Sequence, residues 1–147
     1  MKTLVSILMF CAALLCPGSV LASQSTQQLA VCLTDALDGM ERKQLAKWIY
    51  FGMSSHSMIK PFSKITEKDI DESDRYVGLL ITKLMTEDCP TQAKTAFTES
   101  GSRAFELAFG LVGEVAMQEL MNEPGVVESL GAFEKHLAKE KLDATFK

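Results

Sequence analysis

Two carboxylates lie eight residues apart in the most apolar part of the sequence. A helix over this region places Glu106 and Glu114 on one face, with Gly110 between them. Carboxylates on a central apolar helix are costly to bury unless cations pair with them. The candidate partners are Arg103, Arg75, Lys47 and Arg42. A converging pair could instead act as general acid and base. We expect a buried ion pair or an exposed strip of the helix rather than a catalytic dyad.

The other residues that could do chemistry form no recognisable motif. His56 lies among serines, but the sequence lacks the Gly-x-Ser-x-Gly elbow of many serine hydrolases. His136 and Glu140 have the spacing of two ligands on one helix face, yet no Cys/His cluster accompanies them. Phosphate loops, dinucleotide fingerprints and calcium loops are absent from the sequence. We therefore predict no catalytic residue, no metal site and no cofactor, and we expect that the protein is not an enzyme.

The first 22 residues have the pattern of a secretory signal peptide. Lys2 precedes an apolar run over 4–15, and small or branched residues precede a cleavage site after Ala22. This run of twelve residues is shorter than the roughly 20 that a membrane-spanning helix needs. The sequence predicts a signal peptide over 1–22 and a helical domain over 23–147 with no transmembrane segment. The predicted location is periplasmic or secreted.

Cleavage at that site changes the count of cysteines. The chain has four cysteines, and two of them, Cys11 and Cys16, leave with the signal peptide. The remaining pair, Cys32 and Cys89, is 57 positions apart, whereas redox-active pairs are more often close together, as in Cys-x-x-Cys. Because exported proteins usually meet an oxidising compartment, we predict a structural disulfide between them. The chain-entropy model assigns such a bridge roughly 4 kcal/mol of stability as an upper estimate.

Charge and length exclude several classes of protein. The 147-residue chain is 47% hydrophobic, which is too apolar for a disordered chain, and its length fits one domain. The whole chain has 15 basic and 19 acidic residues. The mature chain lacks Lys2 and keeps 14 basic residues, so its net charge is −5. An acidic balance argues against nucleic-acid binding, since phosphate contacts need clustered lysine and arginine.

Apolar residues recur at spacings of three and four, which is typical of helices. Asp38 with Glu41 forms a predicted capping box, and Thr66 is a predicted N-cap. We expect an all-α, single-domain bundle of five to six helices with one disulfide. The helices are predicted over about 26–36, 38–55, 66–87, 91–99, 103–121 and 126–143. The fifth, which is apolar on nearly all sides, is expected at the centre of the bundle.

A resemblance rests on two groups of residues. The first comprises Cys32 and the ranges 35–39, 41–43, 45–49 and 55–56, and the second comprises 78–81, Leu84 and Cys89. In these stretches, over about half of the mature chain, the sequence resembles small uncharacterised exported proteins of Gram-negative bacteria. The resemblance implies a location in the cell envelope and carries no activity with it. It points to Arg42, Lys43 and Trp48, of which Trp48 is expected in the core.

Methionine and phenylalanine are frequent in the mature chain, with six of the eight methionines and seven of the eight phenylalanines. Such residues can line an adaptable apolar groove, although they are more often simply core. The candidate groove residues are Trp48, Phe105, Phe109, Met117 and Phe133. We expect a non-enzymatic envelope accessory or protein-interaction module that contacts a protein partner through a helix face. The alternative is a carrier of a small apolar ligand or lipid.

Overall fold

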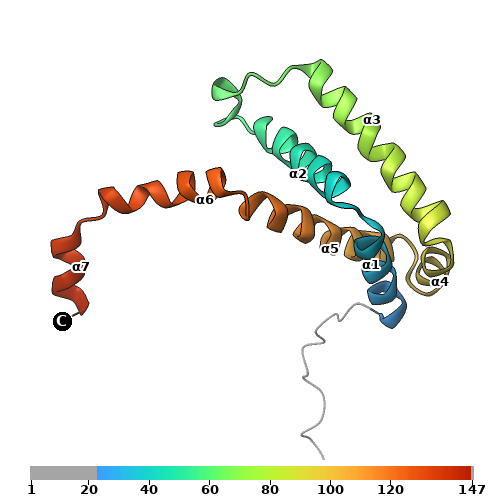
Figure 1. Cartoon of the computed structure of the whole chain (residues 1–147). Helices are drawn as coiled ribbons and strands as arrows, with labels where there is room; N and C mark the ends of the chain where they lie inside the picture. The colour runs from blue at the N-terminus through green and yellow to red at the C-terminus, as the bar shows by residue number, and fades with distance from the viewer. Residues whose placement is uncertain (1–22, 147) are drawn as a thin grey trace, which may run out of the picture.

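The computed structural model describes residues 23–146, and all of its regular elements are helical (Figure 1). The α-helices are α1 (Gln24–Ala36), α2 (Gly39–Ser54), α3 (Glu67–Lys83), α4 (Pro90–Ser100), α5 (Ser102–Met121), α6 (Pro124–Gly131) and α7 (Lys139–Phe146). Shorter elements are the 3-10 turns η1 (Lys60–Phe62) and η3 (Ala132–His136) and the π turn η2 (Leu84–Asp88). The all-α prediction is confirmed. The predicted signal peptide, 1–22, lies outside the described residues.

Side-chain caps fix the starts of α2 and α3. The carboxylate of Asp38 accepts a hydrogen bond from the Glu41 amide at 2.7 Å, and Glu41 accepts one from the Asp38 amide at 2.9 Å. Thr66 and Asp69 exchange the same pair of bonds at the start of α3. Each box satisfies amides that a helix N-terminus leaves without a partner. The predicted box at Asp38 and the predicted cap at Thr66 are confirmed.

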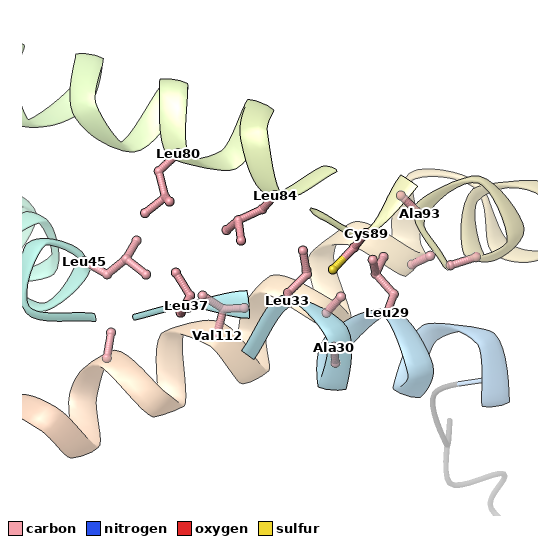
Figure 2. Close-up of a cluster of buried hydrophobic side chains, with 14 of the residues drawn as sticks. Leu29, Ala30, Leu33, Leu37, Leu45, Leu80, Leu84, Cys89, Ala93 and Val112 are labelled. Carbon is pink, nitrogen blue, oxygen red and sulfur yellow. The ribbon is translucent and has the colours of Figure 1, made fainter. Parts of the chain in front are cut away.

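The core lies where α5 crosses α1 and α2 (Figure 2). The inward stripe of α5 repeats every four residues and consists of Ala104, Ala108, Val112 and Ala116. These small side chains let the neighbouring backbones approach closely, and α1 fills the space with Leu29 and Leu33, which are fully buried. Alanine and leucine therefore build one continuous core from α1 to α5.

Helix α5 is central in the bundle, as predicted, but it is not covered on all sides. Leu111 and Met121 on α5 are exposed, at 41% and 44%, although the helix packs against α1, α2 and α4. Helices α6 and α7 run away from α5 instead of folding back over it (Figure 1). The apolar composition of α5 thus leaves apolar surface uncovered.

The single helix predicted over 126–143 is interrupted, which is why α-helices number seven within 23–146 rather than five to six. Helix α6 ends at Gly131, a 3-10 turn follows, and Leu137 adopts an extended backbone conformation. Glycine lowers helix propensity. No residue of Pro124–Phe146 is buried, so packing does not offset that loss. We call this segment the C-terminal arm.

The disulfide Cys32–Cys89 forms as predicted and joins α1 to the corner between α3 and α4. The π turn at the end of α3 leads directly into this corner. Its last bond runs from the amide of Cys89 to the carbonyl of Leu84 at 2.9 Å, which spans five residues. The Cα atoms of the two cysteines are 6.0 Å apart, within the range that a bridge requires. Cys89 is fully buried, so the bridge is part of the core.

Candidate functional site

Helix α3 packs against α2 (Figure 1). Side chains of α3 and α5 line an apolar groove. The deep part of the groove is a cavity of about 230 Å³ between α2, α3 and α5, with Leu45, Leu84 and Val112 in its wall. The outer part is an open cleft of about 650 Å³ that also contacts α4. Ile81 and Phe109 line both parts, so the two lie side by side. We call the two together the apolar groove.

Aromatic side chains form one wall of the outer groove. The rings of Phe97 on α4 and Phe105 on α5 stack with their centroids 5.4 Å apart and their planes at 18°. Phe109 follows one turn later on α5. Across from them lie Ile81 and Met85 of α3. These side chains give the groove an apolar, polarisable lining of the kind that suits hydrocarbon ligands or apolar peptide side chains.

The predicted groove residues separate into two sets. Phe105, Phe109 and Trp48 line the groove. Met117 is half-buried on α5 outside it, and Phe133 lies on the C-terminal arm with 60% of its surface exposed. The groove is also lined by Ile81, Met85 and Phe97. Their helical spacing predicts that they face inward, but it does not predict that they border a groove.

Trp48 is not the core residue that the sequence favours. Its side chain is 39% exposed at the edge of the deep cavity. The indole Nε1 donates a hydrogen bond to Oδ1 of Asp74 on α3 at 2.7 Å. Trp48 therefore connects α2 to α3 beside the groove, with one end apolar and the other in contact with water.

The candidate ion-pair residues do not come together. Glu106 and Glu114 are both exposed and form the solvated strip that was one of the two expectations for them. Among the ion pairs of residues 23–146, none joins either carboxylate to a cation. Arg42 instead donates from Nη2 to the carbonyl oxygen of Thr34 at 3.3 Å, and Lys43 is exposed. Arg42 thus holds the start of α2 to the last turn of α1.

Ionised groups with shifted pKa values support the helix ends rather than the groove. The amine of Lys83 bonds to Asp88 at 2.9 Å and contacts Glu41 at 3.5 Å. The hydrogen bond to Asp88 raises the pKa of Lys83, with a further contribution from Glu41. In the lining of the groove the one charged side chain is Lys94, at the outer rim. The groove therefore presents shape and apolar surface, with no acid–base pair.

The C-terminal arm is a second apolar surface. Its large apolar side chains have exposed fractions between 40% and 82%. They are Val127, Leu130, Phe133, Leu137, Leu142 and Phe146. The arm's main contact with the rest of the chain is where α6 follows α5, and these six side chains are exposed along its length.

Comparison of the chain with protein families, with curated proteins and with solved structures finds no match. Between residues 23 and 146, no helix has both the length and the apolar character that crossing a bilayer would take. The same residues contain no group of three or more His, Cys, Asp or Glu side chains arranged to hold a metal ion.

Proposed function

We propose that the protein is a non-enzymatic interaction module of the cell envelope whose C-terminal arm binds a protein partner. The observation that carries this proposal is that none of the arm's residues is buried, although six of its exposed side chains are large and apolar. Its two α-helices have eight residues each, and isolated helices of that length are marginal in water. A partner surface would supply the packing that the chain itself does not supply.

The chemistry of the partner follows from the arm. Between 124 and 146 there are four carboxylates (Glu128, Glu134, Glu140, Asp143) and three lysines (Lys135, Lys139, Lys141), so charge is nearly balanced. Apolar contact must then dominate binding. On α6, Val126, Val127 and Leu130 lie within one face of the helix. The partner is a protein with an apolar groove that accepts such a helix face.

The envelope setting rests on two features. The predicted signal peptide would export the chain, and the disulfide between Cys32 and Cys89 is typical of proteins from oxidising compartments. Ser23, which would follow the predicted cleavage site, is the N-cap of α1 and accepts a hydrogen bond from the Thr26 amide at 3.3 Å. A mature chain that starts there keeps the first helix intact.

Photo-crosslinking in cells tests the proposal. A photoreactive residue at Leu130 is expected to give one discrete protein adduct, whereas the same residue at Thr98, exposed on α4, gives none. Phe133→Asp in the Leu130 probe should abolish the adduct. An adduct with the mass of two chains would identify the partner as a second copy. Equal labelling at Leu130 and Thr98, or an adduct that survives Phe133→Asp, would overturn the proposal.

A second function is supported by the apolar groove, which fits a carrier of an apolar ligand. Its deep cavity of about 230 Å³ lies beside the aromatic-walled outer cleft. Under this function, protein purified without detergent retains a small hydrophobic molecule that native mass spectrometry detects. Phe109→Glu should release it, and Leu111→Ser, at an exposed position on the same helix, should not. A ligand-free mass for the unaltered protein would eliminate the carrier.

A further inference from the structure

The connection between α2 and α3 carries an apolar protrusion, which we call the tip and define as residues 55–66. Met58 and Phe62 have 74% and 87% of their surfaces exposed, and Ile59 has 44%. Phe62 is the most exposed large apolar residue among residues 23–146. We propose that the tip docks on the surface of an anionic phospholipid bilayer, by inserting these side chains beside lysines that meet the headgroups.

Backbone hydrogen bonds hold the tip in shape. The amides of Ile59 and Lys60 both donate to the carbonyl of His56, at 2.9 and 2.8 Å. The amides of Phe62 and Ser63 donate to the carbonyls of Ile59 and Lys60, at 2.9 and 3.1 Å, and form the turn η1. The apolar side chains are thus displayed by an ordered turn, and little ordering cost remains to be met on binding.

The tip itself, residues 55–66, carries positive charge although the chain as a whole is acidic. Between Glu41 and Glu67 the sequence has no carboxylate side chain. The five basic residues of this interval are Arg42, Lys43 and Lys47 on α2, the first two near the end of that helix remote from the tip, and Lys60 and Lys64. Lys60 and Lys64 lie in the tip itself, and both are exposed.

Of the four carboxylates between 67 and 72, at the start of α3, three have partners, and Glu67 is exposed and forms none of the ion pairs of the described chain. Asp69 bonds to Thr66, Asp71 pairs with Arg75, and Glu72 pairs with Lys68. Among the ion pairs of the described chain, none engages Lys60 or Lys64. Two ammonium groups at the tip therefore remain available to phosphate headgroups.

The position of the tip favours a bilayer over a protein groove as its occupant. It lies where the hairpin of α2 and α3 ends, remote from α4 and from the corner of the disulfide (Figure 1). A protrusion with an apolar end and lysines at its sides matches the boundary between headgroups and acyl chains. Lysine side chains can keep their charge among the headgroups while their methylenes lie along the apolar layer.

Vesicle co-sedimentation of the full chain tests the inference. Binding is expected to vesicles of equal parts phosphatidylglycerol and phosphatidylcholine, to weaken with added salt, and to be absent from pure phosphatidylcholine. Replacing both lysines, Lys60→Gln with Lys64→Gln, should weaken binding by ~30-fold, because each basic residue contributes about 1 kcal/mol at an anionic surface. Phe62→Ser should also weaken it, whereas Leu79→Ser, at an exposed site on α3, should not.

A fluorescence measurement keeps the test independent of sedimentation. Phe62→Trp in a Trp48→Phe background should show a blue shift of emission when phosphatidylglycerol vesicles are added, as the indole leaves water. Circular dichroism checks that each variant keeps its helix content. The inference is overturned if the protein does not bind these vesicles, if Leu79→Ser weakens binding as much as Phe62→Ser, or if the new indole stays in water. It is equally overturned if the tip captures an acidic protein while vesicles leave it unbound.

Discussion

The indole of Trp48 on α2 and the carboxylate of Asp74 on α3 are joined by a hydrogen bond of 2.7 Å. The bond lies beside the deep part of the apolar groove, and Trp48 lines that cavity. Because α3 packs against α2, this contact helps to set how far the groove opens. The one tryptophan of the chain therefore reports on the geometry of a candidate binding surface.

Asp74→Ala should loosen this connection. The lost bond is partly exposed, so the free energy of unfolding should fall by about 1 kcal/mol, and the emission of Trp48 should shift to the red. Asp74→Asn keeps an acceptor oxygen and should retain most of both properties. Urea unfolding monitored by tryptophan fluorescence measures both the free energy of unfolding and the emission of Trp48. Equal effects of alanine and asparagine would show that the hydrogen bond is not responsible.

Removal of the disulfide should produce a larger loss. The double variant Cys32→Ser with Cys89→Ser is expected to lose up to ~4 kcal/mol of unfolding free energy, since its unfolded chain gains the entropy of an open loop. Adding reductant to the unaltered protein should move its urea midpoint to nearly the same value. Mass analysis of the exported protein without reductant should find no free thiol in the mature chain. Two free thiols would refute the bridge.

The small side chains of α5 predict sensitivity to added volume. Ala108 is fully buried within the stripe that packs against α1 and α2. Ala108→Leu should destabilise the protein by about 1–3 kcal/mol, because the close-packed backbones cannot separate without loss elsewhere. Glu106→Leu places the same side chain on the exposed face of the same helix and should change stability by less than about 0.5 kcal/mol. Thermal unfolding of both variants measures the contrast, and equal melting temperatures would argue against close packing at Ala108.

Acid should weaken the start of α3. Hydrogen bonds from the side chain and backbone of Thr66 lower the pKa of Asp69 below its ordinary value of 3.8. A carboxyl group whose pKa is lower in the folded state stabilises that state above its ordinary pKa, and the contribution is lost as pH falls through the lowered value. Thr66→Ala should bring the pKa of Asp69 back toward 3.8 in an NMR titration. An unchanged titration curve would contradict the role of the capping box.

Local signals in the sequence predict the helices between residues 24 and 121 well. Asp38 and Thr66 form hydrogen bonds with residues three positions away, so the local sequence alone predicts their capping role. The cysteine pair is likewise predictable, because composition leaves two candidates after the predicted cleavage. These features predict where α2 and α3 begin and which corner the disulfide joins to α1.

The surfaces of the molecule are less predictable, for a physical reason. Periodicity marks Ile81 and Phe105 as inward-facing, but whether their neighbours meet or leave a groove depends on the angle between α3 and α5. The arm has a helical pattern, yet continuity of a helix there depends on packing that the chain does not provide around Gly131. For Glu106, two environments were compatible with an apolar helix, and its exposure follows from the face of α5 that stays uncovered.

Native mass spectrometry of the protein isolated from its envelope fraction, without reductant or detergent, tests the central claim most directly. The comparison is between the unaltered chain and the variant Leu130→Asp with Phe133→Asp, which keeps the body of the fold because neither side chain is buried. We predict that the unaltered chain appears in a protein complex of defined stoichiometry and that the variant appears as a free monomer. Identical spectra, with both chains monomeric or both in the same complex, would contradict the assignment of the arm as the binding surface.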